Sequence, residues 1–472
     1  MNIQHSETTA VDAKGDKLRF AIIGAGMSGI LTAIKLQKLG IENFAIYEKA
    51  DRLGGTWRDN TYPGLSCDVP SHLYRYTFEP NPDWSRMFSP GQEIWEYFDS
   101  VAKKYGVESR IQYNKEVTKA EHKNGKWCLE MGDGSQDTVD FVIAATGVLH
   151  HPVYPDIEGL DTFEGPCFHS ARWDHSASLD GKRVGIIGTG STAIQIVPAI
   201  IDQVEKVSLF QRTAQWVLPL PNPAFTDDEK AAFNSSPELL EQTFCEARDQ
   251  FANSFSEAVI GDQEKMAEIV EACQANLDTV QDPELKAKLT PNYQVACKRL
   301  IMSDEFYPAI QKDNADVVTT GIERIEPKGV RTTDGVLHEL DILVIATGFD
   351  GHAFTGPMNI VGTNGVTLHE AWADSKEAYR SVAVPGFPNF FMLVGPNSPI
   401  GNFSLILISE MQLDYIMQLI DHARDGECRQ IVAKQEATDR FNAEIKAAMT
   451  GTVWVSGCNS WYLDKNGNPA MW

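Results

Sequence analysis

Short apolar runs along this chain lead into glycine-rich turns, and one such arrangement occurs twice. The run Phe20–Ile23 precedes the turn GAGMSG at residues 24–29, and residues 184–187 precede GTGSTA at residues 188–193. Each pattern predicts a buried parallel strand, a tight turn and the start of a helix. Because the free amides at a helix start bind phosphate, each turn is a candidate site for the pyrophosphate of a dinucleotide.

Both repeats also close in the same way. An Asp-Gly turn is followed by a continuous apolar run that begins with Asp and ends in Thr-Gly. The turns are Asp133-Gly134 and Asp334-Gly335, and the runs are residues 140–147 and 341–348. Asp-Gly favours a hairpin, and an apolar run of this length is typical of a buried parallel strand. The sequence therefore predicts an α/β fold with two Rossmann-like dinucleotide-binding domains, one inserted into the other.

The two repeats differ in one charge. Glu48 follows the first glycine turn at the same distance at which Arg212 follows the second. An acidic side chain at this position accepts hydrogen bonds from a ribose 2′-hydroxyl, whereas an arginine matches a 2′-phosphate. The pattern predicts one site for FAD or NAD and one for NADP. Together they indicate a flavoenzyme that is reduced by NADPH.

The segment at about residues 227–290 breaks this pattern and predicts a helical insertion. It is rich in Glu, Ala, Leu and Gln, with apolar residues at helical spacing. Further helices are expected at about residues 409–424 and 438–449. The expected organisation is a disordered leader at 1–16, a FAD-binding domain at 17–150 and 385–472, a linker at 151–178, and an NADP-binding domain at 179–384.

Composition narrows the class of protein. The net charge of −24 over 472 residues argues against nonspecific binding to nucleic acid or to anionic membranes. No stretch is apolar enough to span a bilayer and residues 1–16 lack a signal core, so we expect a cytoplasmic protein. The eight cysteines form no CxxC motif, and we expect all of them to be reduced structural thiols. They are Cys67, Cys128, Cys167, Cys245, Cys273, Cys297, Cys428 and Cys458.

Two longer patterns lie between the glycine turns. Residues 163–174 match FxGxxxHxxxW[PD]. The fixed positions are Phe163, Gly165, His169, Trp173 and Asp174. Residues 54–68 match [AG]GxWxxxx[FY]P[GM]xxxD at every fixed position. With these fingerprints the chain, from about residue 18 onward, resembles the type I Baeyer–Villiger monooxygenases within the flavin-containing monooxygenase superfamily.

The resemblance implies FAD, NADPH and molecular oxygen as reactants. In that family a C4a-peroxyflavin attacks a ketone carbonyl and an ester or lactone forms, and many members also oxidise sulfides. A peroxyanion needs a fixed positive charge beside it. The resemblance assigns that charge to Arg299 and its orientation to the carboxylate of Asp68. Lys298 and Arg212 would share the 2′-phosphate of NADP.

The resemblance and the two turns together assign the remaining contacts. On the FAD side these are Gly24, Gly26, Ser28, Gly29, Glu48, Gly55, Thr56, Trp57, Asp68, Val117, Thr146 and Gly147. On the NADP side they are Gly188, Thr189, Gly190, Ser191, Thr192, Arg212, Thr213, Lys298, Arg299 and Trp461. The substrate pocket is expected to be lined by Ile400, Asn402, Phe403 and Trp461. No metal site is predicted.

We make more limited predictions for two further residues, His169 and Ala296. His169 is a tempting general base, but the resemblance indicates that it fixes the connection between the two domains by hydrogen bonds. Ala296 stands where many relatives have glycine. If the backbone there requires a positive φ, the alanine carries modest strain.

Two other functions stay open. A flavin monooxygenase that oxidises sulfides or amines would share most of this site, but such relatives usually carry an aromatic and a basic residue where this chain has Trp173-Asp174. A redox sensor that binds both nucleotides without turnover would be indicated by loss of Asp68 or Arg299, and both are present. The sequence identifies neither the ketone nor the oligomeric state.

Overall fold

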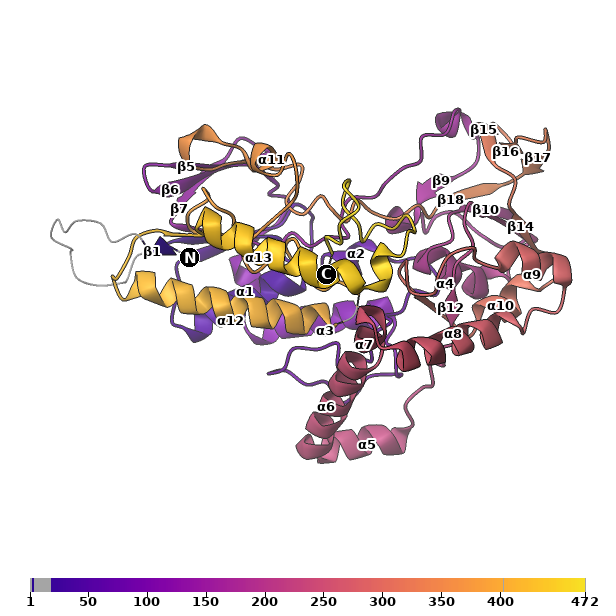
Figure 1. Ribbon diagram of the computed structural model, residues 1–472, viewed down its shortest axis with the longest axis horizontal. Helices are drawn as coiled ribbons and strands as arrows, with labels where there is room; N and C mark the ends of the chain where they lie inside the picture. The colour runs from indigo at the N-terminus through magenta and orange to yellow at the C-terminus, as the bar shows by residue number, and fades with distance from the viewer. Residues whose placement is uncertain (1, 4–17, 402, 472) are drawn as a thin grey trace.

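Two parallel sheets of five strands form the centres of two modules that lie side by side (Figure 1). The computed structural model describes residues 2–3, 18–401 and 403–471. The first sheet has the order β20-β8-β2-β3-β4 and the second the order β14-β11-β10-β18-β9. All neighbouring strands in both sheets run parallel. The predicted α/β fold with two Rossmann-like modules is therefore confirmed.

The first module follows the predicted order of strand, glycine turn and helix. Its sheet consists of β2 (Phe20–Ile23), β3 (Phe44–Tyr47), β4 (Ile111–Gln112), β8 (Phe141–Ala144) and β20 (Phe390–Met392). Its helices include α1 (Met27–Lys38), α2 (Thr56–Asp59), α3 (Gly91–Lys104), α12 (Leu405–Arg424) and α13 (Gln435–Ala448). Every residue of β2, β3 and β8 is buried, as expected for apolar runs with helices on both faces.

The second module repeats this plan. Its sheet consists of β9 (Cys167–His169), β10 (Arg183–Ile187), β11 (Lys206–Phe210), β14 (Ala315–Val318) and β18 (Ile342–Ile345). Helix α4 (Ser191–Ile200) follows its glycine turn, and α10 (Phe306–Ile310) packs against α4. The short parallel strands β12 (Val217–Leu218) and β13 (Ile301–Met302) connect the ends of the helical insertion.

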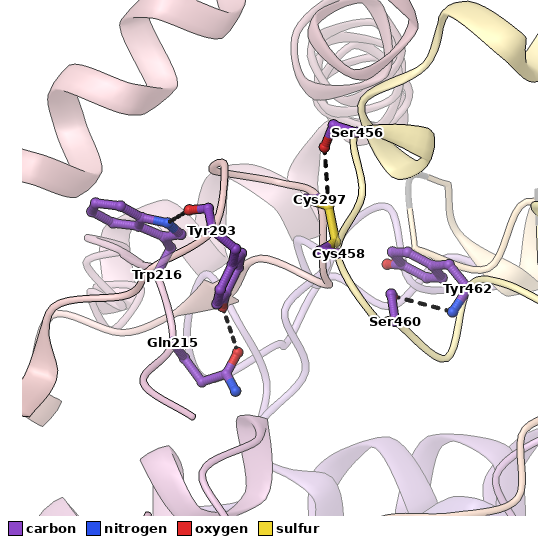
Figure 2. Close-up of a disulfide and its surroundings, with 8 residues drawn as sticks. All are labelled: Gln215, Trp216, Tyr293, Cys297, Ser456, Cys458, Ser460 and Tyr462. Atoms are coloured by element: carbon purple, nitrogen blue, oxygen red, sulfur yellow. Dashed lines mark hydrogen bonds between the residues drawn. A yellow bond between two sulfur atoms is a disulfide. The ribbon is translucent and has the colours of Figure 1, made fainter. Parts of the chain in front are cut away.

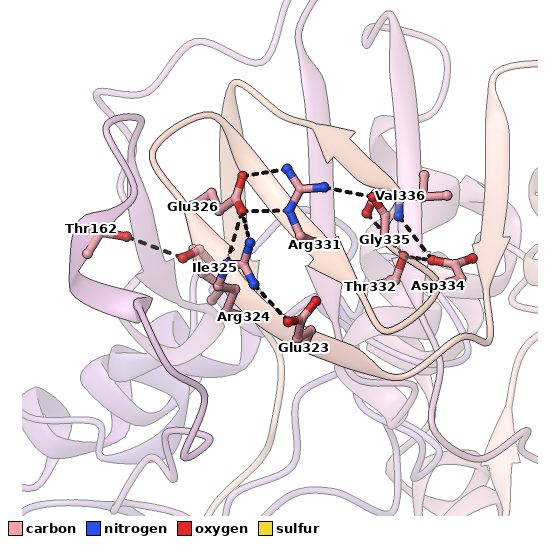
Figure 3. A network of polar contacts seen from close by, with 10 residues as sticks. All are labelled: Thr162, Glu323, Arg324, Ile325, Glu326, Arg331, Thr332, Asp334, Gly335 and Val336. Carbon is pink, nitrogen blue, oxygen red and sulfur yellow. Dashed lines mark hydrogen bonds and ion pairs between the residues drawn. The ribbon is translucent and has the colours of Figure 1, made fainter.

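Each module carries a small sheet built on the predicted Asp-Gly hairpin. In the second module it contains β15 (Ile322–Glu326), β16 (Gly329–Thr332) and β17 (Leu337–Glu339). The carboxylate of Glu326 accepts hydrogen bonds from Arg324 and Arg331, and the hydroxyl of Thr332 donates to Asp334 at the turn (Figure 3). Gly335 has φ 83°, a conformation that glycine adopts without strain. The hairpin is thus fixed by local chemistry.

The corresponding sheet of the first module takes a strand from far along the chain. It contains β5 (Val117–Lys123), β6 (Lys126–Met131) and β7 (Gln136–Val139), and β19 (Asn359–Val361) pairs in parallel with β5. Strand β19 lies inside the range 179–384 that we expected for the second module. The chain therefore returns to the first module before residue 385, and α11 (Leu368–Ala371) packs against β19 there.

The predicted helical insertion is present as five consecutive helices. They are α5 (Asp227–Ser235), α6 (Pro237–Asn253), α7 (Phe255–Ile260), α8 (Gln263–Leu277) and α9 (Pro283–Leu289). The side chains of Thr226, Ser236, Asp262 and Asp282 accept backbone hydrogen bonds at the starts of four of them, which supplies partners for unpaired amides. Helices α5 and α6 extend below the junction of the two modules, and α8 runs beneath the second (Figure 1).

Two expectations concern the ends and the surface of the molecule. Of the leader expected at residues 1–16, the described part is Asn2–Ile3, which forms β1 antiparallel to β21 (Ile431–Val432). The rest of that leader lies outside the described residues. Among the described residues, no helix combines the length and apolarity that crossing a membrane requires.

Candidate active site

A large cavity of about 1370 Å³ lies between the two modules, and residues of both line it. Its lining includes nearly all residues that the sequence assigned to FAD, NADP and substrate. Of those assigned residues, Gly29 does not line the cavity. The five fixed positions of the fingerprint at 163–174 do not line it either. Asn402 is outside the described residues. The two glycine turns thus face one shared space.

In the first glycine turn, glycine stands where a side chain would meet the backbone. Gly24 has φ 103°, and a Cβ added there would lie 2.6 Å from the carbonyl oxygen of Ala145. A Cβ on Gly29 would lie 1.9 Å from the carbonyl oxygen of Gly24. Gly26 and Gly55 face each other, since a Cβ on Gly26 would lie 3.6 Å from the Cα of Gly55. This bare backbone at the start of α1 fits the pyrophosphate of FAD.

Glu48 directly follows β3, lines the cavity and is almost wholly buried. Oε2 accepts a hydrogen bond from the amide of Ala25 at 2.8 Å, and Oε1 accepts one from the amide of Ala50 at 2.9 Å. The guanidinium of Arg58 also donates to Oε1, at 3.0 Å. These bonds hold the carboxylate beside the glycine turn, where a remaining lone pair can accept from a ribose hydroxyl.

The second glycine turn has the same construction. Gly188 has φ 119°, and a Cβ there would lie 2.3 Å from the carbonyl oxygen of Ala346. The hydroxyl of Thr189 donates to the carbonyl of Thr213 at 2.8 Å, which ties the turn to the segment after β11. This segment carries Arg212, so the guanidinium lines the same space as the turn. The pair of features suits a dinucleotide with a 2′-phosphate.

Lys298 lies near Arg212 and adds a second positive charge to this end of the cavity. Burial lowers the pKa of Lys298 below its usual value, and the charge of Arg212 lowers it further. Neither side chain forms an ion pair with a carboxylate of the described residues, and Lys298 Nζ lies over the ring of Tyr293 at 4.7 Å. Two neighbouring cations without an acidic partner form a site for an anion.

Asp68 and Arg299 form an ion pair in the cavity lining. Asp68 raises the pKa of Arg299 far above its usual value, against the opposing effect of burial. The hydroxyl of Tyr462 lies near the guanidinium, since a Cβ added to Gly401 would lie 2.5 Å from that hydroxyl and 3.1 Å from Nη1 of Arg299. The cavity therefore contains a positive charge that no ordinary pH removes.

The loop that carries Asp68 is fixed to the second module. Gly64 has φ 80°, and a Cβ there would lie 2.4 Å from the carbonyl oxygen of Gln195 on α4. The side chain of Gln195 accepts a hydrogen bond from Tyr62 at 2.9 Å and donates to the carbonyl of Ser66 at 3.0 Å. The sequence analysis missed Gln195, because nothing in its surroundings marks it. The contact places a carboxylate from one module against an arginine from the other.

The fingerprint at residues 163–174 has a structural role beside the cavity. His169 is fully buried at the end of β9, and its Nδ1 accepts from the amide of Ala171 at 3.1 Å. Burial lowers the pKa of His169, which favours the neutral ring. Phe168 packs edge-to-face on Trp173 at 5.0 Å, and a Cβ on Gly165 would lie 2.3 Å from the carbonyl oxygen of Asp341. Asp174 accepts from Ser176 in an exposed turn.

A disulfide joins the Arg299 segment to the C-terminal loop (Figure 2). It links Cys297 to Cys458, whose Cα atoms are 6.2 Å apart, and the hydroxyl of Ser456 donates to the sulfur of Cys297. The expectation that all eight cysteines are reduced is therefore wrong for these two. The partners are separated by 161 residues, so spacing along the chain could not show that the fold brings them together. The other six cysteines are free.

Ala296, which stands where many relatives have glycine, directly precedes Cys297. Ala296 has φ 63° and is buried. The position does require the left-handed conformation, which an alanine adopts only at a cost.

The third side of the cavity is largely apolar. It is lined by Met302, Val394, Ile400, Phe403, Leu405 and Trp461, together with Phe251 from helix α6. Trp461 is 36% exposed, and its carbonyl lies 2.7 Å from Nε2 of His352. The sequence analysis predicted a helical insertion here but gave Phe251 no role, because only the fold shows that this residue reaches the cavity. An apolar region beside a fixed charge suits a small organic substrate.

These features define a class: a two-module protein that holds two dinucleotides around one cavity with an apolar pocket. Comparison with known proteins identifies the family. The sequence model of the flavin-binding monooxygenase-like family matches residues 17–226. An uncharacterized monooxygenase, Rv0892 of Mycobacterium tuberculosis, is 49% identical over 96% of this chain and 91% of its own length. A Baeyer–Villiger monooxygenase of Streptomyces coelicolor is 39% identical, over 97% and 89%.

Solved structures agree with this result. The crystal structure of cyclohexanone monooxygenase from Rhodococcus sp. Phi1 bound to NADP⁺ superposes with a TM-score of 0.86 and 31% identity, over 95% of this chain and 92% of that one. The chain therefore belongs to the flavin-binding monooxygenases, and among them to the family of the Baeyer–Villiger monooxygenases. It is a flavin-dependent monooxygenase.

Proposed function

We propose that this protein is an NADPH-dependent Baeyer–Villiger monooxygenase that converts a ketone to an ester or lactone. One atom of O₂ enters the product between the carbonyl carbon and a neighbouring carbon, the other leaves as water, and NADPH supplies the two electrons. The observation that carries the proposal is the Asp68–Arg299 pair in a cavity that both glycine turns and an apolar pocket share.

FAD and NADPH are the cofactors, and the residues present fit both. The bare backbone at Gly24 and Gly26 would hold the FAD pyrophosphate, and the carboxylate of Glu48 would bind its ribose. The turn at Gly188 would hold the pyrophosphate of NADPH, and Arg212 with Lys298 its 2′-phosphate. When bound and reduced, the flavin supplies the activation of O₂.

Arg299 supplies the charge that ketone oxidation requires. Oxygen insertion into a ketone needs an anionic oxidant, which a nearby proton donor would quench. The pKa of Arg299 is raised, so the guanidinium stabilises a negative charge without giving up its proton. Asp68 holds one edge of the guanidinium, which fixes its direction while the rest of it stays available in the cavity.

The apolar lining has a second role. Side chains such as Ile400, Phe403 and Trp461 exclude water from the region around Arg299. Low local polarity strengthens the effect of the positive charge and protects an anionic oxidant from protonation. The substrate is therefore expected to be a ketone with an apolar body.

The test is product analysis with the purified, FAD-loaded protein. It is incubated with NADPH, O₂ and a panel of cyclic, linear and aryl ketones together with thioanisole, and products are identified by mass. An ester or lactone that carries one added oxygen atom supports the proposal. Sulfoxide as the sole product, with every ketone recovered, would indicate a heteroatom oxygenase, and NADPH turnover without any oxygenated product would exclude both.

The variant Arg299→Ala tests the assigned role. We expect it to bind FAD and to be reduced by NADPH, because neither step needs the guanidinium, but to form no ester. Hydrogen peroxide should accumulate in place of product. Ester formation at the wild-type rate by this variant would contradict the role of Arg299.

A further inference from the structure

The Arg299 guanidinium has a second neighbour, and this neighbour belongs to the C-terminal loop. Tyr462 is 5% exposed, and its hydroxyl lies near Nη1 of the guanidinium, whereas Asp68 pairs with Nη2. Gly401 marks the meeting point. A Cβ on Gly401 would lie 2.5 Å from the hydroxyl of Tyr462 and 3.1 Å from Nη1 of Arg299. The phenol and the guanidinium thus occupy the space that the missing side chain leaves.

The loop around Tyr462 is built so that this hydroxyl has a fixed place. The Tyr462 ring packs on Trp454 at 5.7 Å and on Trp461 at 4.6 Å. Its amide donates to the hydroxyl of Ser460 at 3.2 Å, and its carbonyl accepts from the amide of Ala470 at 2.8 Å. Because these contacts hold both its ring and its backbone, Tyr462 has a fixed position and can orient the guanidinium of Arg299.

The disulfide ties the same loop to the same segment a second time (Figure 2). Cys297 lies two residues before Arg299, and Cys458 lies four residues before Tyr462. The covalent bond and the polar contact together hold the arginine segment and the loop as one unit. Loop position and guanidinium direction are therefore coupled.

We propose that Tyr462 is a positioning residue for Arg299: its hydroxyl fixes the guanidinium in the direction that oxygen transfer needs, and it does so only while the C-terminal loop is in place. This inference rests on the proposed function for its activity readout. Burial raises the pKa of Tyr462, so the phenol is neutral and acts as a partner for the cation, not as a second charge.

The test compares Tyr462→Phe with wild type in the FAD-loaded enzyme. The phenyl ring keeps its packing on Trp454 and Trp461 and loses the hydroxyl. We expect the rate of oxygenated product, from whichever ketone or sulfide the wild type accepts, to fall by about 10-fold, as loss of a hydrogen bond to a charged group predicts. The KM for NADPH and the rate of flavin reduction should stay at wild-type values, so that peroxide release rises. A merely structural role would change these values together.

The matched control is Tyr105→Phe. This tyrosine lies outside the cavity lining and its hydroxyl donates to Glu79 at 3.0 Å, so its loss should leave the ratio of product to NADPH unchanged. Gly401→Ala is a second probe, because the added methyl group would push the phenol and the guanidinium apart without backbone strain. It should reproduce the Tyr462→Phe result.

A crystal structure of Tyr462→Phe supplies a readout that is independent of activity. We expect the Arg299 guanidinium to leave its present direction while Asp68 and the disulfide stay in place. An unmoved guanidinium in this structure would overturn the inference, whatever the assay shows. Absence of any oxygenated product from the wild type would overturn the proposed function instead, and the two failures are thus distinguishable.

Discussion

Replacement of Arg212 by alanine should weaken the binding of NADPH and leave the binding of NADH unchanged. Arg212 and Lys298 line one end of the cavity, and neither forms an ion pair with a carboxylate of the described residues. NADPH differs from NADH by the 2′-phosphate that would fill this place. A hydrogen bond to a charged group contributes about 1.5–3 kcal/mol, and about 1.4 kcal/mol corresponds to a factor of ten. We therefore expect the KM for NADPH to rise by about 10- to 100-fold.

The KM for NADH should not change in Arg212→Ala, because that cofactor presents no phosphate to the lost guanidinium. The value of kcat should be retained at saturating NADPH, since uniform binding is lost and the transition state is untouched. The assay is steady-state oxidation of each cofactor at 340 nm and constant ionic strength. Lys312→Ala is the control, because Lys312 is a cation of the same module that pairs with Asp202 at the surface. Equal losses for NADH and NADPH would refute the assignment of Arg212 to the phosphate.

Three further outcomes follow from the same region. Ala296→Gly should raise the free energy of unfolding by about 0.5–1 kcal/mol in a denaturant titration, because relief of the left-handed strain exceeds the entropy that glycine adds to the unfolded chain. The KM for NADPH should rise with pH as Lys298 loses its proton, and the rise should begin at a lower pH than for an ordinary lysine because the pKa of Lys298 is lowered. The variant Lys298→Arg should not show this rise, and the KM for NADH should not rise in either protein. Cys458→Ser should lower the free energy of unfolding by about 2–5 kcal/mol, as expected for loss of a disulfide that closes a long loop, whereas Cys245→Ser, at a free cysteine, should not.

The sequence predicts those parts of the site that a short stretch of chain determines. The turn at residues 24–29 and the turn at 188–193 were predicted with their strands and helices because steric demands there are local: a Cβ on Gly29 would meet the carbonyl of Gly24, five residues away. Glu48 and Arg212 were found in the same way, since one strand and one helix fix their distance from each turn.

The sequence did not predict what depends on contacts between distant segments. The disulfide between Cys297 and Cys458, and the contact between Tyr462 and Arg299, join segments that only the docking of the two modules brings together. The contact between Gly64 and Gln195 likewise could not be predicted, because Gln195 lies on a helix of the other module. The sequence analysis gave Tyr462 no role, because only the fold shows that its hydroxyl lies near Arg299.

The charged centre of the cavity exists only at this junction. Asp68 comes from a loop of the first module, Arg299 from the segment that follows the helical insertion of the second, and Tyr462 from the C-terminal loop. A displacement of one module relative to the other would break the Asp68–Arg299 pair and leave a partly buried carboxylate and a partly buried guanidinium unpaired, which carries a cost. The pair therefore favours the docked arrangement in which both nucleotide cradles face each other. In this arrangement the group that would stabilise the oxidant also contributes a contact between the two modules.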